Sequence, residues 1–157
     1  MLDSDTPAKP RVILLADDDP DDIDMTRRAL TKNDLGVEIF TVGDGEELVD
    51  FLNHRGAHAP PARSPTPSLI LLDLNMPKMD GREALAKIKS DPKLQPIPVV
   101  VMTTSTAEQD ILRAYELGSN SFISKPITLA ELVDITKVLG QYWFEVVKLP
   151  KPAERET

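Results

Sequence analysis

The sequence predicts an α/β protein built on a doubly wound parallel sheet of five strands, with helices on both faces. Two features of the 157-residue chain predict this fold. Short apolar runs of strand length alternate five times with segments whose apolar residues have helical spacing. Three of the runs are continuously apolar, as expected for strands buried on both faces. Right-handed crossovers through the helices would then join successive strands.

The predicted strands are short runs rich in Val, Ile, Leu and Phe. In chain order they span residues 12–16, 37–42, 69–72, 99–102 and 122–123. The runs that begin at 12, 69 and 99 are the continuously apolar ones, so these strands are expected to be the most buried.

The first two predicted helices begin behind acidic residues. Residues 20–33 form the first, because Pro20 occupies the first helical position and Asp19 is a candidate N-cap. Residues 45–54 form the second. They follow a capping-box sequence with Asp44 at the cap and carry an apolar stripe.

The last three predicted helices have recognisable starts or ends. Residues 81–90 have helical spacing and stop before Pro92. The fourth helix begins with a T-x-x-Q sequence at Thr106 and ends at Gly118. A T-x-x-E sequence begins the fifth, which is expected to cover residues 129–147.

One domain accounts for a chain of this length. The expected boundaries are residues 1–10 for an N-terminal tail, 11–149 for the domain with its extended last helix, and 150–157 for a C-terminal tail. Residues 56–68 contain four prolines and few apolar residues, which predicts an exposed loop. His54 and His58 lie at a helix end and in this loop, and both are expected to be solvated surface residues.

Composition excludes several functions. The 18 basic against 26 acidic side chains give a net charge of −8, which disfavours a nucleic-acid-binding protein. The absence of cysteine excludes disulfides, thiolate metal sites and a cysteine nucleophile. No apolar run is long enough to span a membrane and the first ten residues do not resemble a signal peptide, so a cytoplasmic protein is expected.

Residues able to carry chemistry follow the predicted strands. Asp17 and Asp18 follow the first, Asp73 the third, Thr103 the fourth and Lys125 the fifth. The carboxyl ends of parallel strands meet at one edge, where ligands bind in such folds. Three adjacent carboxylates would repel one another unless a cation joined them, and Mg²⁺ prefers such oxygen ligands. With a hydroxyl and an ammonium group added, the set could place a phosphoryl group on a carboxylate, and Asp73 is the best acceptor candidate.

A simpler interpretation applies to the other acids near the first helix, which are Asp19, Asp21, Asp22 and Asp24. Acidic residues at a helix start commonly cap it or compensate its dipole. Taken alone, Thr103 fits a strand-end or capping role equally well, and a lysine before proline is unremarkable. The combination of Asp17, Asp18 and Asp73 with Lys125 is much harder to explain in this way.

At these positions the sequence resembles the receiver domain of bacterial two-component response regulators. The matching segments are ILLADDD at 13–19, LLDLNMP at 71–77 with DG at 80–81, VVVMTT at 99–104 and SKP at 124–126. They occur in family order and spacing, and the resemblance covers about residues 11–140. It implies a flavodoxin-like (βα)5 fold with strand order 2-1-3-4-5.

The resemblance also implies roles for the matching residues. Asp73 would accept a phosphoryl group from a sensor histidine kinase. Asp18 would bind Mg²⁺ directly, Asp17 mostly through water, and Asp73 and the backbone carbonyl of Asn75 would complete the protein ligands. Lys125 would pair with the phosphoryl group, and the Lys125–Pro126 bond would be cis.

The family's switch depends on a threonine and an aromatic residue. Thr103 would move to hydrogen-bond the phosphoryl group, and the residue at the aromatic position here is Phe122, which has no phenolic hydroxyl. Phosphorylation adds about −1.5 to −2 charge and three acceptor oxygens, which would bias this two-state element.

Only a short segment follows the last predicted helix, so the expected output is contact with a downstream protein or phosphotransfer protein. The long loop at residues 56–68 and the extended last helix with Trp143 resemble single-domain regulators paired with bacterial phytochromes. Such a protein would be a phosphoacceptor with at most autocatalytic phosphorylation and dephosphorylation, not an enzyme.

Two other functions compete with this one. A magnesium-dependent phosphatase of the haloacid-dehalogenase type also combines a strand-end Asp, Thr and Lys. It needs a second Asp two residues after the nucleophile as general acid, and Asn75 at that position cannot protonate a leaving group. A scaffold that is never phosphorylated is the third interpretation, and it has no use for three adjacent carboxylates.

Apolar residues cover more than half of the circumference of the last predicted helix. Among them are Tyr142, Trp143 and Phe144. One sheet-facing stripe needs only slightly more than 100° of a helix. A very well buried terminal helix would explain this pattern, but a second apolar face favours a homodimer interface.

Overall fold

In the computed structural model, the described residues are 11–33, 36–103, 116, 121–124 and 128–140. The strands are β1 (Arg11–Ala16), β2 (Val37–Val42), β3 (Leu69–Leu72), β4 (Val99–Thr103) and β5 (Ser121–Ser124). The helices are α1 (Pro20–Lys32), α2 (Gly45–Asn53), α3 (Gly81–Ser90) and α5 (Leu129–Gly140), with a short 3₁₀ helix, η2 (Gly56–His58). Within these ranges, no helix has the length and apolar character needed to cross a membrane.

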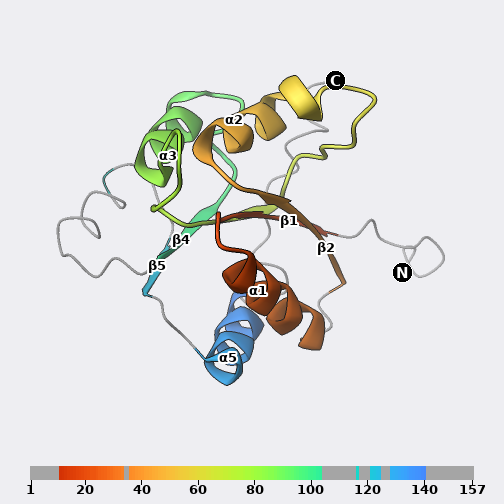
Figure 1. Cartoon of the computed structure of the whole chain (residues 1–157), viewed down its shortest axis with the longest axis vertical. Helices are drawn as coiled ribbons and strands as arrows, with labels where there is room; N and C mark the ends of the chain where they lie inside the picture. The colour runs from red at the N-terminus through yellow and green to blue at the C-terminus, as the bar shows by residue number, and fades with distance from the viewer. Residues whose placement is uncertain (1–10, 34–35, 104–115, 117–120, 125–127, 141–157) are drawn as a thin grey trace.

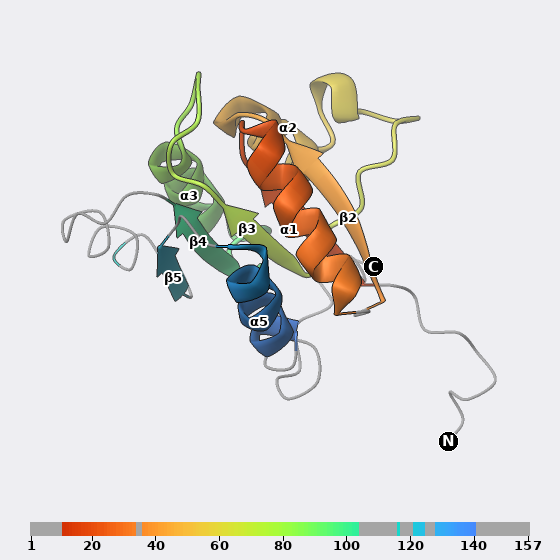
Figure 2. The ribbon, with the colours of Figure 1, turned by 60° about the horizontal axis from the view of Figure 1, so that its bottom comes forward.

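The strands form one parallel sheet in the order β2-β1-β3-β4-β5, which confirms the predicted fold class and strand order. Figure 1 shows α2 and α3 on one face of this sheet and α1 and α5 on the other. The turned view in Figure 2 shows α1 and α5 side by side across the strands. The doubly wound arrangement therefore covers the central strands β1 and β3 on both faces.

Two apolar clusters fill the space between the sheet and its helices. On one face, Leu14 and Leu72 pack with Phe51 of α2 and Leu85 of α3. On the other face, alternate residues of the same strands pack against α1 and α5, and this cluster includes Ile13, Leu15, Leu71, Leu30 and Leu132. Because neighbouring strand residues serve opposite cores, the central strands are continuously apolar, as the sequence predicted.

Side chains cap the helices as the sequence predicted. The amide of Asp21 donates to the carboxylate of Asp19 at 2.9 Å, and Pro20 begins α1. Asp44 accepts from the amide of Glu47 at 2.8 Å at the start of α2. At α5, Thr128 and Glu131 form a reciprocal capping box, with the amide of each residue bonded to the side chain of the other.

The loop at residues 56–68 differs from the prediction of an exposed connector. Ser64 and Pro67 are buried, and the ring of His58 packs edge-on against Phe51 with centroids 5.0 Å apart. Arg63 forms an ion pair with Glu38 of β2 and lies over the ring of Phe40. The loop therefore folds over the edge strand. The prediction that His58 is solvated is wrong, because its side chain is only 17% exposed.

Several sequence predictions fall outside the described residues. They concern the tails, nearly all of the helix expected between Thr106 and Gly118, the extension of the last helix beyond Gly140, and the Lys125–Pro126 bond.

Candidate metal and phosphoryl site

The acidic residues lie where β1 and β3 end. Asp17 and Asp18 follow Ala16, and Asp73 follows Leu72 on the neighbouring strand. Ala16 and Leu72 are paired in register, so the acidic residues that follow them emerge side by side at the carboxyl edge of the sheet. The sheet register therefore brings together residues more than fifty positions apart in the sequence.

Backbone hydrogen bonds fix both strand ends. The amide of Asp73 donates to the carbonyl of Ala16 at 2.9 Å, which extends the β1–β3 ladder by one bond. On the other side, the amide of Asp17 donates to the carbonyl of Val42 at 3.0 Å, which joins β1 to the end of β2. The backbones of both buried acidic residues thus belong to the sheet and not to a free loop.

Oxygen atoms from the carboxylates of Asp17, Asp18 and Asp73 all lie within 4.8 Å of one another. Asp17 and Asp73 are buried, whereas Asp18 is exposed. Two unit charges at about 4 Å repel by about 1 kcal/mol in water and about 4 kcal/mol near a protein surface. The three carboxylates are therefore a costly arrangement without a counterion, and their all-oxygen donor set fits a hard divalent cation such as Mg²⁺.

Short local bonds orient two of the carboxylates. The amide of Asp19 donates to Oδ1 of Asp17 at 3.0 Å, and the amide of Asn75 donates to Oδ1 of Asp73 at 3.0 Å. Each bond spans two residues and forms a turn in which an aspartate accepts from its own chain. The loops after β1 and β3 thus hold these side chains in similar ways before any ligand binds.

The two buried acidic residues line part of a small cavity of about 10 Å³. Its polar lining residues are Asp17, Asp73 and Thr26, and the others are apolar residues of β1, β3 and β4. This volume is about what one water molecule requires. Thr26 is buried on α1, and sequence inspection missed it. The sequence indicated it only by placing the Thr26 hydroxyl on the same face of the helix as Ala29 and Leu30, which are also buried.

Two glycines allow the surrounding loops to approach closely. A Cβ at Gly81 would lie 2.6 Å from the Cα of Leu74, directly after Asp73. A Cβ at Gly45 would collide with the carbonyl oxygen of Met79, to which the Gly45 amide donates at 2.9 Å. The chain after β3 is thus packed against both the start of α3 and the start of α2.

The remaining predicted site residues follow the same edge of the sheet. Thr103 ends β4 and is paired in register with Ser124 at the end of β5, one position before Lys125. Phe122 lies in β5 opposite Val101. The side chains of Thr103 and Phe122 and the whole of Lys125 fall outside the described part of the chain, as do the predicted interface residues Tyr142, Trp143 and Phe144.

Comparisons with a family model and with known sequences both match the chain to response regulators. The family model of the response regulator receiver domain matches residues 13–137. The chain is 41% identical over 147 residues to response regulator Rcp1 of Synechocystis sp., covering 94% of this chain and 98% of that protein.

Solved structures of similar proteins agree with the fold. A phosphorylated cyanobacterial phytochrome response regulator, RcpA, superposes with a TM-score of 0.82 at 42% identity, covering 90% of this chain and 99% of that one. The Mn²⁺-bound form of Rcp1 superposes with a TM-score of 0.81 at 41% identity over the same shares of the two chains. The bacteriophytochrome response regulator AtBRR gives a TM-score of 0.72 at 37% identity, again over 90% and 99%.

Proposed function

This chain belongs to the response regulator receiver family, and we propose that it accepts a phosphoryl group on Asp73 from a sensor histidine kinase. The convergence of Asp17, Asp18 and Asp73 at the carboxyl edge of the sheet is the observation that carries the proposal. Asp73 ends the central strand β3, and its backbone is bonded to β1. Among the three, Asp73 is the one on β3, which lies between β1 with the other two acidic residues and the strands followed by Thr103 and Lys125.

In the proposed transfer, a carboxylate oxygen of Asp73 bonds to phosphorus as the phosphorus–nitrogen bond of a phosphohistidine breaks. The electron pair of that bond stays with the histidine nitrogen. Lys125 is proposed to pair with the phosphoryl oxygens, and Thr103 to donate its hydroxyl to one of them. Their positions after β5 and at the end of β4 support these roles.

The proposed cation is Mg²⁺, held by Asp17, Asp18, Asp73 and the backbone carbonyl of Asn75. A bound divalent cation would neutralise charge on the phosphoryl oxygens. The acidic donor set supports a hard cation, and the related Rcp1 has a Mn²⁺-bound form. Without a cation, bringing a phosphate group to three carboxylates would add further repulsion to the site.

Phosphorylation is proposed to switch a protein-binding surface. New acceptor oxygens at Asp73 would draw the Thr103 side chain inward, and Phe122 on the adjacent β5 would follow it. Because Phe122 lacks a hydroxyl, any partner would detect the position of its ring and not a phenolic hydrogen bond. The output would be contact with a downstream protein or a phosphotransfer protein, and not with nucleic acid or a membrane.

The similarity to phytochrome response regulators supports a bacteriophytochrome as the kinase. We propose a cytoplasmic location for the chain, as is consistent with its family. We also propose a homodimer formed through α5. Val138 on this helix is 62% exposed, and the apolar sequence that continues to Tyr142, Trp143 and Phe144 supports an apolar contact at this helix.

Incubation with Mg²⁺ and acetyl phosphate, followed by intact mass measurement, tests the proposal. The expected result is a gain of one phosphoryl group that is lost in Asp73→Asn. Steady turnover of small phosphoesters would instead indicate a phosphatase, although Asn75 offers no general acid for one. A chain that binds no Mg²⁺ and gains no mass would be a scaffold.

A further inference from the structure

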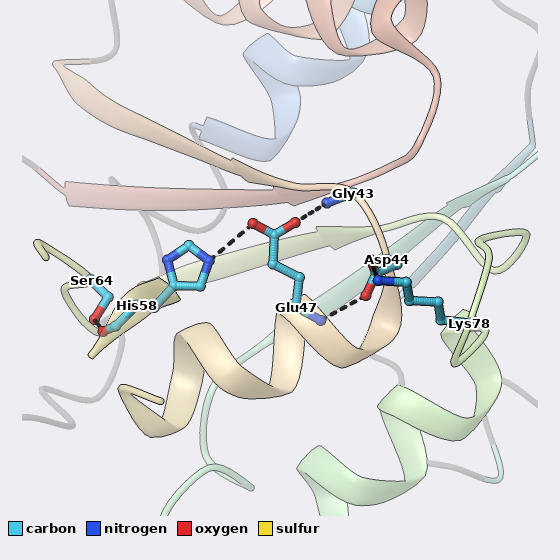
Figure 3. A network of polar contacts seen from close by, with 6 residues as sticks. All are labelled: Gly43, Asp44, Glu47, His58, Ser64 and Lys78. Carbon is cyan, nitrogen blue, oxygen red and sulfur yellow. Dashed lines mark hydrogen bonds and ion pairs between the residues drawn. The ribbon is translucent and has the colours of Figure 1, made fainter. Parts of the chain in front are cut away.

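The carboxylate of Glu47 joins two separate parts of the chain. Its Oε1 accepts a hydrogen bond from the amide of Gly43 at 2.8 Å, and its Oε2 lies 3.0 Å from Nε2 of His58 (Figure 3). Glu47 itself is fixed at the start of α2, because its amide donates to Asp44. One side chain thus ties the turn between β2 and α2 to the loop at residues 56–68.

The turn held by Glu47 leads directly to the acidic site. Gly43 follows Val42, and the carbonyl of Val42 accepts the hydrogen bond from the amide of Asp17 at 3.0 Å. Gly43 has no side chain with which to fix its own orientation. The bond to Glu47 therefore restrains the peptide plane between Val42 and Gly43, which carries the acceptor for Asp17.

The loop end of this connection is also well held. The ring of His58 packs on Phe51, which is a fully buried residue of α2. The hydroxyl of Ser64 donates to the backbone carbonyl of His58 at 3.0 Å, and Nδ1 of His54 lies 2.8 Å from the same hydroxyl. His58 therefore offers Glu47 a pre-placed partner and not a freely rotating side chain.

We propose that Glu47 and His58 are positioning residues for the metal ligand Asp17, acting through Gly43 and the Val42 carbonyl. The loop at residues 56–68 thereby becomes part of the structure that sets cation affinity. The inference rests on the proposed function, because it assumes that the acidic cluster binds a cation. It adds two residues that contact neither the cation nor the phosphoryl group.

A purely structural role for Glu47 is the competing explanation, since it also occupies the third position of a capped helix. The chain offers a matched control at Glu131, which occupies the same position in the capping box of α5 and bonds only to Thr128 among the described residues. Glu47→Met and Glu131→Met each remove one capping carboxylate. Glu47→Gln keeps an acceptor for Gly43, and His58→Phe keeps the ring on Phe51 while removing the bond to Glu47.

Two readouts separate positioning from capping. The first is the hydrogen-exchange rate of the Asp17 amide in metal-free protein. It is expected to rise about fivefold to tenfold in Glu47→Met as the Val42 acceptor loosens. The second is the Mg²⁺ dissociation constant by titration. It is expected to rise at least about threefold in Glu47→Met, less in His58→Phe, and to return close to the wild-type value in Glu47→Gln.

Glu131→Met is expected to leave both readouts unchanged. Equal effects of Glu47→Met and Glu131→Met, or no effect of Glu47→Met, would overturn the inference while leaving the proposed function intact. If Glu47→Met fails to fold, His58→Phe decides the question, because it leaves the cap of α2 in place. A wild-type chain that binds no Mg²⁺ would overturn both proposals.

Discussion

The amide of Asp73 donates a hydrogen bond to the carbonyl of Ala16 at 2.9 Å, one residue before Asp17. This bond continues the β1–β3 ladder beyond the last paired residues, so it fixes the separation of two acidic residues that are far apart in sequence. Repulsion between their carboxylates cannot be relieved by moving the strands apart without breaking sheet hydrogen bonds. The sheet thus holds the negative charges together, and a bound cation would reduce the repulsion between them.

Mg²⁺ is expected to stabilise the wild-type protein against unfolding. At a concentration about 100 times its dissociation constant, the gain would be about 2.7 kcal/mol. Asp18→Asn removes the exposed carboxylate of the cluster and should weaken Mg²⁺ binding at least about tenfold. Urea titrations with Mg²⁺ and with a chelator measure both effects.

The same Asp18→Asn variant should be slightly more stable than wild type when no metal is present, by up to about 1 kcal/mol, because one source of repulsion is gone. A metal-free variant that is clearly less stable than wild type would contradict the electrostatic description of the cluster.

Gly45→Ala should distort the approach of the chain after β3 to the start of α2. The added Cβ would collide with the backbone of Met79, which cannot turn away as a side chain could. We expect a loss of about 1–3 kcal/mol in the free energy of unfolding and slower phosphorylation by acetyl phosphate. Gly43→Ala is the matched control for the free energy of unfolding alone, because its Cβ would meet only Oε1 of Glu47 at 3.8 Å. Similar losses in both variants would contradict this explanation.

The ion pair of Arg63 with Glu38 should make the anchoring of the loop depend on pH. The hydrogen bond from Arg63 lowers the pKa of Glu38 below its ordinary value. A carboxyl group with a lowered pKa in the folded state stabilises the protein at neutral pH and loses this contribution as the pH falls through the folded pKa. Arg63→Met should therefore be less stable than wild type at pH 7.

The difference between Arg63→Met and wild type should shrink as the pH falls through the lowered folded-state pKa of Glu38, where this carboxyl becomes protonated in wild type as well. Urea unfolding at pH 7 and at a series of acidic pH values measures the difference, and Met retains apolar contact with Phe40. A difference of the same size at all of these pH values would show that the ion pair contributes nothing.

Self-association through α5 should depend on Val138. Val138→Glu places a charge in the proposed apolar contact and is expected to shift the protein toward monomer in sedimentation equilibrium. Ala130→Glu adds the same charge at another exposed position of α5 and should not change the assembly state. Wild-type protein that stays monomeric with and without phosphorylation would refute the proposed dimer.

The sequence was sufficient to predict the sheet and the acidic cluster, because both follow from local patterns and one geometric rule. Continuous apolar runs marked β1, β3 and β4, and the parallel arrangement then placed Asp17, Asp18 and Asp73 at one edge. The helix starts were equally predictable, because Asp19 and Asp44 each accept a capping hydrogen bond from an amide only two or three residues further along the chain.

The contacts of the loop at residues 56–68 could not be predicted in this way. Arg63 pairs with Glu38, which lies 25 residues away, and the proline content of the loop gave no indication of that partner. His58 appeared to be a surface residue because its burial depends on Phe51 and on the path of the loop. Thr26 escaped notice for a related reason, because a threonine on a buried helix face shows its cavity only after the strands are in place.

The identity of the modified residue is the most direct test of the central claim. After phosphorylation with acetyl phosphate and Mg²⁺, borohydride reduction converts an aspartyl phosphate to homoserine, and peptide mass spectrometry then locates it. The expected result is homoserine at position 73 alone, with Asp17 and Asp18 intact. Homoserine at position 17 or 18, or a phosphorylated protein with position 73 unmodified, would contradict the assignment of Asp73 as the phosphoryl acceptor.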